Sequence, residues 1–418
     1  MMLDFDGIYD ARLWFNTHTN GLARRAAALA EAIDWDGARP GAPTVLCLER
    51  ALFRKDIDEM RRRTDLSLVE IRAARVKKAQ EPWIAPRFRT QTYFYDYLED
   101  GLKRAKAPLA RFGRIFLETA QRRGKISAVL AGNTDYWQDE AIKLGCESLG
   151  IPFLVLCREN YVWKKSADVV YRRMIDSKFK FRGQGVAVAS EITRQTLVTS
   201  GAFSADQVVV TGWPRFDGWV GRAEAGGKRN SIVLLSYAEK RYLAPENFVD
   251  TLKVFTALAL AHPDRAHFVI KTKKANETEE VFEICPELRN SKVEVTGTRS
   301  LMDLYDDARV VVGYNSLAVL EILLSGAAVV VPWWGDAVRP QTECLLSGEN
   351  PADQGVVSFA PDAGALKALI EQAIAGTLSP LGTTAERFSR FSAHSSFDPA
   401  KSSSQRVADW IGSQLQRS

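Results

Sequence analysis

The chain has 418 residues, of which 46% are hydrophobic and 26% are charged, and its formal net charge is +5. This composition is ordinary for a globular protein of about two domains, each able to bury a sizeable core. No apolar run approaches the roughly 18–20 residues of a membrane-spanning helix, and Asp4 and Asp6 stand where a signal peptide would carry positive charge. We therefore expect a cytoplasmic protein.

The cysteines and histidines do not show the spacing of a metal site. Five cysteines are scattered without a CxxC pair, and none of the four histidines belongs to an HxxxH or HxH pair. We expect reduced thiols in the core, no disulfide framework and no metal centre.

Basic clusters crowd the first part of the chain, for example "MRRRTDLSLVEIRAARVKKAQ" (60–80). No recognition-helix, zinc-finger or RRM signature accompanies them, so we expect no nucleic-acid partner. Solvated helix faces explain most of these charges. The alternatives are an anionic ligand or peripheral contact with the inner face of a membrane.

Short apolar segments alternate with amphipathic helices in the first half of the chain. The predicted strands cover 43–50, 126–130, 151–157, 185–190 and 207–212, and the second of them runs into a loop that reaches residue 134. Such alternation is typical of a doubly wound parallel sheet. The region from about 51 to 125 shows only a basic helical pattern, which favours an insertion beside the binding cleft.

A second alternating series follows a break rich in Gly, Pro and charge at 212–230. Its predicted strands are 231–237, 266–273, 292–297 and 310–314, a further strand precedes Trp333, and a helix covers 364–376. We expect an N-terminal domain over 1–215, a C-terminal domain over 216–390, and a terminal loop and crossover helix over 391–418. In α/β sheets of this kind, ligands bind at the carboxyl ends of the strands, here in a cleft between the two domains.

Several nucleotide and catalytic motifs are absent from the sequence. No Walker loop, GxGxxG or GxSxG follows a strand. The triplets Asp4–Asp6 and Asp56–Asp58 do not follow an apolar strand, where a metal-nucleotide DxD belongs. We therefore expect no bound metal.

The segment "VVVGYNSLAVLEILLSGAAVVVPWW" (310–334) predicts strand, sharp turn, short helix and strand. Asn315 and Ser316 begin the helix, where free N–H groups favour phosphate oxygens, and Glu321 is placed to accept hydrogen bonds from a ribose. The alternative is that Asn315 or Ser316 only caps the helix and Glu321 faces solvent.

This segment resembles the C-terminal half of GT-B glycosyltransferases of the surface- or capsular-polysaccharide type. It is more distantly similar to CDP-glycerol glycerophosphotransferases and UDP-N-acetylglucosamine 2-epimerases. "VTGWPRFD" (210–217) and "DEAIKLGCESLGIPFLVLCREN" (139–160) are also similar to segments of that group, and the resemblance covers roughly 126–335.

The resemblance implies two Rossmann-like domains and a nucleotide-sugar donor bound by the second. It places the phosphates at Ser316 and the ribose at Glu321. Lys271 and Lys273, at one strand end, are expected to meet a donor phosphate or solvent. The predicted donor site as a whole comprises Ser236, Lys271, Lys273, Asn315, Ser316, Leu317 and Glu321.

The resemblance also assigns the linker segment. Gly212 and Pro214 are expected to shape the hinge. Arg215 and Asp217 are expected either to take part in function or to form an ion pair that fixes the conformation of the linker.

The catalytic base is expected in the first domain, after its predicted strands. Asp135, in the loop with Asn133, is the first candidate and Glu159 is the second, because an inverting transferase needs one group to deprotonate the acceptor hydroxyl. Asp139 and Glu140 are expected to cap a helix or face solvent.

Together with the resemblance, the sequence predicts a metal-independent GT-B glycosyltransferase, with inversion expected and retention as the alternative. It needs no cofactor beyond its donor and transfers sugar to a glycan or glycolipid acceptor in bacterial capsule or lipopolysaccharide biosynthesis. The alternatives are a nucleotide-sugar 2-epimerase and a catalytically silent nucleotide-sugar-binding partner.

Overall fold

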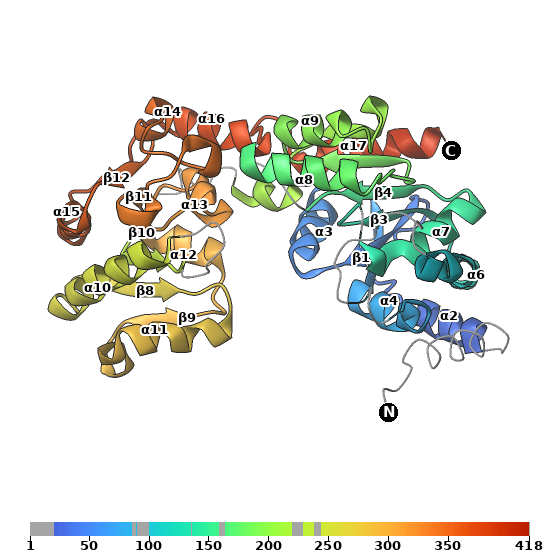
Figure 1. Cartoon of the computed structure of the whole chain (residues 1–418), viewed down its shortest axis with the longest axis horizontal. Coiled ribbons are helices and arrows are strands. Elements are labelled where there is room, and N and C mark those ends of the chain that lie inside the picture. The colour runs from blue at the N-terminus through green and yellow to red at the C-terminus, as the bar shows by residue number, and fades with distance from the viewer. Residues whose placement is uncertain are drawn as a thin grey trace. The chain divides into compact units, whose positions relative to one another are not determined.

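The computed structural model describes residues 21–85, 89, 100–134, 136–158, 164–219, 229–237 and 244–417. The chain divides into two compact units (Figure 1). The first unit comprises 1–161, 167–217 and 395–418, and the second comprises 162–166 and 218–394. Each contains one six-stranded sheet.

The sheet of the first unit is parallel and has the strand order β2-β1-β3-β4-β5-β6. The order reverses between β1 and β3. The strands are β1 (Thr44–Glu49), β2 (Ser67–Arg72), β3 (Ile126–Ala131), β4 (Phe153–Leu156), β5 (Gly185–Val188) and β6 (Val208–Val210).

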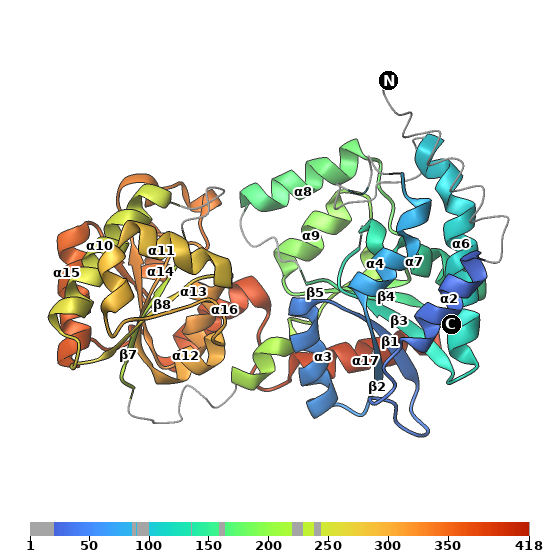
Figure 2. The same cartoon turned by 90° about the horizontal axis from the view of Figure 1, so that it is seen from below.

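Helices cover both faces of this sheet. Figure 2 shows α3 and α17 on one face, and α4, α7, α8 and α9 on the other. The helices are α2 (Gly21–Glu31), α3 (Ala51–Arg63), α4 (Ala73–Gln80), α6 (Asp100–Gln121), α7 (Glu140–Leu149), α8 (Lys164–Asp176), α9 (Glu191–Thr199) and α17 (Ser403–Gln416).

The central strands are buried on both faces over their middle positions, which is why these positions are apolar. Val45 to Leu48 of β1 and Ala128 to Ala131 of β3 have 0% exposure. Parallel strands covered by helices on both faces favour such continuous Val, Leu and Ala runs over an alternating pattern.

The region from 51 to 125, expected as an insertion beside the binding cleft, contributes a strand to the sheet within its described part. Its segment Ser67–Arg72 forms β2, which pairs with β1 in the register Leu46↔Val69 and Leu48↔Ile71. The helical pattern hid this strand because it lies at the sheet edge, where Glu70 and Arg72 interrupt its apolar residues.

The second unit has a parallel sheet of order β12-β11-β10-β7-β8-β9. The order reverses between β7 and β10. The strands are β7 (Ser231–Leu235), β8 (His267–Lys271), β9 (Glu294–Thr296), β10 (Ala308–Val312), β11 (Ala328–Pro332) and β12 (Ser358–Ala360).

Helices of the second unit follow its strands in turn, and α10 and α15 pack against each other. The helices are α10 (Pro245–Ala261), α11 (Thr278–Ile284), α12 (Leu301–Asp307), α13 (Leu317–Glu321), α14 (Pro351–Gln354), α15 (Ala363–Ala375) and α16 (Thr384–Ser395).

Helix α17 returns the chain to the first unit, as predicted for a crossover helix. Its buried side chains follow the spacing of one helical face: Ser403, Ser404, Val407, Trp410, Ile411 and Gln414. A Cβ atom on Gly185 of β5 would lie 3.0 Å from the Trp410 ring, so the helix packs directly on this strand.

None of the described helices combines the length and apolarity needed to cross a membrane.

Candidate functional site

The carboxyl ends of β7 and β10 lie side by side at the reversal of strand order in the second unit. Ser236 and Tyr237 follow β7, and the turn from Gly313 to Ser316 follows β10. Ligands of open α/β sheets bind at this edge, at the point of reversal. Ser236 and the predicted residues of the turn thus share one edge of one sheet.

The turn after β10 passes through Asn315, which has a left-handed backbone with φ of 39°. Its side chain holds the turn in place. The Asn315 Nδ2 donates to the Glu343 carbonyl at 3.0 Å, and the Leu345 N–H donates to its Oδ1 at 2.9 Å. Asn315 therefore binds protein main chain with both ends of its amide and fixes the start of α13.

Ser316 is the N-cap of α13, and its hydroxyl accepts a hydrogen bond from the Val319 N–H at 3.3 Å. This is the capping role that the sequence allowed as an alternative. Donation by the same hydroxyl to a phosphate oxygen stays a prediction. α13 has five residues and continues into the 3-10 turn η7 (Ile322–Leu324).

The exposed side of α13 carries the predicted ligand-binding side chains. Ser316, Leu317 and Glu321 are half-buried, whereas Val319 and Leu320 are buried. Burial raises the pKa of Tyr305 well above its ordinary value, and the nearby Glu321 carboxylate raises it further. The Tyr305 hydroxyl donates to the Ala318 carbonyl at 2.9 Å, so this buried side chain holds α13 from the core side.

Two aromatic side chains support the same edge from within the core. The Tyr314 hydroxyl donates to the Ala337 carbonyl at 2.8 Å, and the Tyr237 hydroxyl donates to Asn247 Oδ1 at 2.7 Å. The two rings lie 5.6 Å apart between centroids. Both hydroxyls are therefore engaged within the protein.

The predicted lysines occupy different positions. Lys271 ends β8, and its ammonium group donates to the carbonyls of Thr272 and Gly297. Lys273 lies beyond the strand with an exposed side chain, and its main-chain N–H donates to Glu277 at 3.0 Å. Lys271 is thus oriented across the strand end by main chain, and a donor-phosphate contact by either lysine stays a prediction.

A buried arginine stabilises the segment behind α13. Arg387 of α16 donates to the carbonyls of Ile322, Leu323, Ser325 and Ala327 at 2.7–3.3 Å. Burial lowers the pKa of Arg387 to about 10. Its charge lies where carbonyl groups at the end of the η7 turn carry partial negative charge.

Gly212 in the linker segment accommodates helix α17. It has φ of 71°, and a Cβ atom there would lie 2.7 Å from Ser403 Oγ and 3.0 Å from Arg406 Nη2. Arg406 also donates to the Thr211 carbonyl at 2.8 Å. Only glycine fits this close approach without displacing the helix.

Arg215 and Asp217 bind different partners and do not form a pair with each other. Arg215, in the 3-10 segment η4 (Pro214–Trp219), lies with its Nε 3.3 Å from Asp56 Oδ1, and its main-chain N–H donates to the same oxygen at 3.0 Å. Asp217 accepts from the N–H groups of Ser403 and Ser404, both at 2.7 Å. These two residues and Gly212 therefore stabilise the first unit and the attachment of α17.

The environment of Asp56 is unusual for an ion-paired carboxylate. Burial raises the pKa of Asp56 to about 6, although the Arg215 charge lowers it. The Arg215 guanidinium also lies 4.1 Å from the centre of the Trp213 ring. Desolvation exceeds the ion-pair attraction here because both groups are almost entirely buried.

The predicted catalytic carboxylates, Asp135 and Glu159, lie outside the described residues. Asn133, at the end of β3, is 3% exposed, and its Oδ1 has no hydrogen-bond partner among the described residues. A buried amide oxygen without a partner is costly. The carboxyl end of β3 thus has one unused acceptor.

The expectation that Asp139 and Glu140 cap a helix or face solvent is wrong. Both are 1% exposed and ion-paired. Asp139 Oδ1 lies 2.6 Å from Arg50 Nη2, and Glu140 pairs with Lys143 and Arg182. Burial raises the pKa of Asp139, and Arg50 opposes that shift.

Sequence reasoning missed Arg50, which directly follows β1. Its guanidinium lies 5.3 Å from the centre of the Tyr136 ring, and that of Arg158, two residues after β4, lies 5.5 Å from the same ring centre. The available signal was an arginine as the last residue of the predicted strand 43–50.

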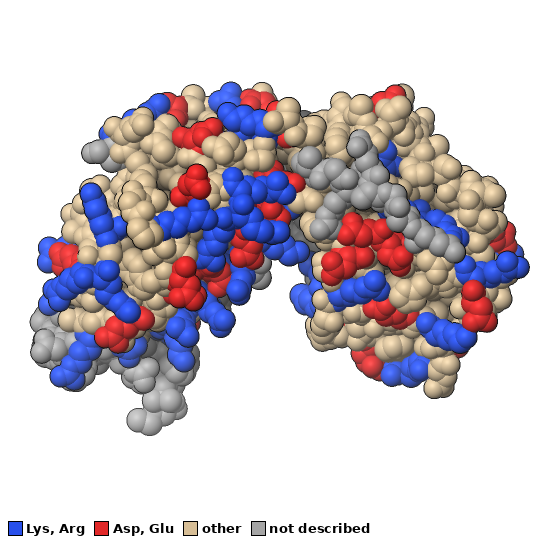
Figure 3. Space-filling view, turned by 180° about the vertical axis from the view of Figure 1, so that it is seen from behind, with Lys and Arg blue, Asp and Glu red and all other residues tan. Residues whose placement is uncertain are grey.

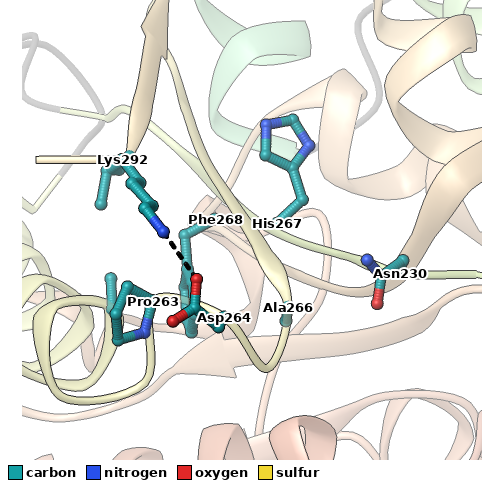
Figure 4. Close-up of a pocket in the computed structure, with 9 residues that line it drawn as sticks. Asn230, Pro263, Asp264, Ala266, His267, Phe268 and Lys292 are labelled. Atoms are coloured by element: carbon teal, nitrogen blue, oxygen red, sulfur yellow. Dashed lines mark hydrogen bonds and ion pairs between the residues drawn. The ribbon is translucent and has the colours of Figure 1, made fainter.

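A cavity of about 340 Å³ lies at the opposite edge of the second sheet, beside the amino ends of β7 and β8. It is lined by Asn230 and His267, among others, and by the Lys292–Asp264 ion pair of 2.6 Å (Figure 4). This edge is not where open α/β sheets bind ligands. The cavity is therefore separate from the candidate site.

No protein-family model and no curated protein sequence matches this chain. Solved structures with a similar fold include a putative UDP-N-acetylglucosamine 2-epimerase from Listeria monocytogenes, with 10% identity and a TM-score of 0.51, covering 90% of this chain and 98% of that one.

Two further similar structures have lower TM-scores. The UDP-GlcNAc 2-epimerase from Neisseria meningitidis bound to UDP-GlcNAc has 13% identity, a TM-score of 0.47, and coverage of 89% of this chain and 99% of that one. An α,α-trehalose-phosphate synthase from Burkholderia xenovorans has 12% identity, a TM-score of 0.44, and coverage of 90% and 99%.

The likeness to the Listeria structure extends over nearly both whole chains and concerns the fold. It spans both units, each of which has a six-stranded parallel sheet. The protein therefore has the GT-B fold, as the resemblance predicted.

Proposed function

We propose that the chain is a glycosyltransferase that transfers a sugar from a nucleotide-sugar donor to a glycan or glycolipid acceptor of bacterial surface polysaccharide biosynthesis. Its donor site is the carboxyl edge of the second unit, around the turn after β10. Its acceptor is bound by the first unit. No metal ion or additional cofactor takes part in this proposal.

The observation that carries the proposal is the backbone of Asn315. A residue other than glycine with φ of 39° is held in the left-handed region by two side-chain hydrogen bonds, at the point where the strand order reverses. Such a conformation costs about 1–3 kcal/mol and is concentrated at ligand-binding sites. The turn presents the half-buried Ser316, Leu317 and Glu321 on one side of α13.

The roles of these side chains follow from their chemistry. Glu321 would accept hydrogen bonds from the ribose hydroxyls, and Ser316 would donate to a phosphate oxygen with the hydroxyl hydrogen that its capping bond leaves unused. Lysine and arginine side chains would stabilise the charge that develops on the leaving nucleoside diphosphate.

In an inverting reaction, one base removes the proton of the acceptor hydroxyl as its oxygen attacks the anomeric carbon. The bond between that carbon and the donor phosphate breaks, and the nucleotide leaves with the bonding electron pair. We propose Asp135, and next Glu159, for the base, because they follow β3 and β4 in the chain.

The similar structures support a nucleotide-sugar donor by their names, since these include a 2-epimerase bound to UDP-GlcNAc and a UDP-forming trehalose-phosphate synthase. A nucleotide-sugar 2-epimerase is the second candidate, because an enzyme named as such shares the fold over nearly its whole length. Epimerisation would use the same donor site without an acceptor.

Donor turnover measured with and without acceptor tests the proposal. The full chain is incubated with a panel of nucleotide sugars, alone and with membrane-derived glycolipids, and the released nucleotide and sugar products are identified by mass spectrometry and NMR. Sugar transfer that requires acceptor is expected. An epimerised sugar formed from the donor alone would overturn the transferase, and binding without turnover would indicate a silent partner.

A further inference from the structure

A cavity of about 520 Å³ opens at the carboxyl ends of β1 and β2 in the first unit. Four of its lining residues are cations, and only one is acidic: Arg50, Arg54, Arg72 and Lys77 against Glu49. We call this cavity the basic pocket. Figure 3 shows Lys and Arg side chains gathered over one face of the first unit.

The cations of the basic pocket are largely unused within the protein. Arg54 and Arg72 are exposed, and neither side chain forms a hydrogen bond or ion pair among the described residues. The Arg54 charge acts on the Glu70 carboxylate, where burial raises the pKa and this charge lowers it. Lys77 lies 5.6 Å from the centre of the Trp137 ring, which positions its ammonium group without neutralising it. These charges are therefore available to a ligand.

Arg50 is the most constrained of the four. Its Nη2 binds Asp139 at 2.6 Å, and its buried Nε has no acceptor among the described residues. Asp139 and Glu49 offset two of the four positive charges, so two remain. Two net positive charges match a phosphate dianion.

Main-chain groups add to this field. Arg50 and Arg72 are the N-caps of α3 and α4, and neither helix start has a side-chain capping bond. Ala73 and Ala74, in the first turn of α4, line the basic pocket. Uncapped N–H groups of two helices thus reinforce the four cationic side chains.

The volume and position indicate what the pocket holds. The cavity of about 520 Å³ is larger than a single ion requires and falls in the range of small-molecule sites. It lies at the ligand-binding edge of the sheet, next to the reversal between β1 and β3, and Gln138, after β3, lines it.

We propose that the basic pocket binds a phosphate ester carried by the second substrate. This proposal rests on the proposed function in one respect, namely that the donor occupies the second unit. Arg54 and Arg72 bind the phosphate oxygens, Lys77 supplies the point charge, and Arg50, whose Nε has no acceptor among the described residues, adds a further donor.

Titration of the full chain with inorganic phosphate, followed by calorimetry and thermal stabilisation, tests this site directly. Arg54→Gln and Arg72→Gln should each weaken phosphate binding about tenfold, equivalent to about 1.4 kcal/mol, since each removes a charge-assisted hydrogen bond. Arg75→Gln is the matched control, because Arg75 is an exposed residue of the same helix α4 that does not line the pocket. It should leave phosphate binding unchanged.

Three results would overturn the proposal: absence of phosphate binding by the unmodified chain, equal binding of acetate, or unchanged phosphate binding in both variants. A parallel loss of nucleotide affinity in Arg54→Gln and Arg72→Gln would also overturn it, since the pocket would then serve the donor. Failure of the chain to bind any nucleotide would overturn the proposed function. The phosphate titration would still show whether the basic pocket binds phosphate.

The carrier of the phosphate is identified with a soluble sugar phosphate and with vesicles containing an anionic phospholipid. Binding of either one that is lost in Arg72→Gln supports the proposal. Binding of neither, when free phosphate binds, contradicts the phosphate-ester assignment.

Discussion

Asp217 binds Ser404 through two hydrogen bonds, although 187 positions separate the two residues in the chain. The carboxylate Oδ2 accepts from the main-chain N–H at 2.7 Å and from the hydroxyl at 2.6 Å. The other oxygen accepts from the Ser403 N–H at 2.7 Å. Asp217 therefore closes the amino terminus of α17 with a negative charge, where the helix dipole favours one.

Replacing Asp217 should detach this end of α17. We expect Asp217→Ala to lower the free energy of unfolding by about 2–4 kcal/mol, because several buried donors lose a charged acceptor. Denaturant unfolding and hydrogen exchange of α17 measure the effect. Asp362→Ala is the control, since Asp362 caps α15 with one exposed hydrogen bond, and it should cost about 1 kcal/mol. Equal costs for the two variants would contradict the role of Asp217.

A side chain at Gly212 should have a similar effect by a different route. Gly212→Ala adds a left-handed alanine, which costs about 1–2 kcal/mol, and a clash 2.7 Å from Ser403 Oγ. Gly150→Ala is the matched control, because Gly150 has φ of 64° and no atom within 4 Å of the added Cβ. Melting temperatures should fall further for Gly212→Ala than for Gly150→Ala. An equal fall in melting temperature for the two variants would show that α17 can shift away from residue 212 at no cost.

The stability of the fold should depend more on the shape of the side chain at position 387 than on its charge. Arg387→Met removes this donor from the buried carbonyls of Leu323, Ser325 and Ala327, whereas the Ile322 carbonyl keeps its bonds from Ser325. We expect a cost of about 3–5 kcal/mol, because unsatisfied buried acceptors are costly. Arg387→Lys keeps the charge but has no fork to reach these carbonyls, so we expect it to restore only part of the loss. Full recovery of the melting temperature by lysine would refute this explanation.

The buried Asp56 makes stability depend on pH. Its pKa is raised to about 6 in the folded chain, against about 3.9 in an unfolded one. The folded state therefore binds the proton more tightly, and the stability from this group is present below pH 4 and lost as pH rises through 6.

Asp56→Asn removes this dependence. The stability of the variant relative to the unmodified chain should rise by up to about 3 kcal/mol between pH 4 and pH 7. Thermal melts of both proteins across this range provide the measurement. A constant difference between them would mean that Arg215 keeps Asp56 ionised throughout.

Glu321 tests the donor site. We expect Glu321→Ala to weaken nucleotide binding about a hundredfold, equivalent to about 3 kcal/mol, without changing the fold. Glu283→Ala, on an exposed position of α11, is the control and should bind nucleotide normally. The readout is thermal stabilisation by a series of nucleotides. Unchanged affinity in Glu321→Ala would place the nucleotide elsewhere.

Much of the fold was predictable because buried parallel strands are marked by continuous apolar runs. The segments that form β3, β7 and β10 are of this type, and their Val and Leu side chains are buried. The edge strand β2 was not predictable from periodicity. Its Glu70 pairs with Arg61 of α3, a contact that only the folded sheet creates.

The candidate site was predictable in its location more than in its details. A turn of small and polar residues after an apolar strand pointed to Asn315 and Ser316. The left-handed φ of Asn315 depends on its bonds to residues 343 and 345, which are far away in the chain. The partners of Arg215 and Asp217 likewise come from α3 and α17, so adjacency in the sequence suggested a pair that the fold separates.

The return of α17 to the first unit also sets an order of assembly. All six strands of the first sheet precede residue 211, but the helix that covers β5 begins at Ser403. During synthesis, the binding surface for Trp410 and Ile411 must stay uncovered while residues 218–394 of the second unit are translated. We conclude that the first unit is incomplete until both sheets exist, so a ribosome stalled between them would leave an apolar face open to chaperones or aggregation.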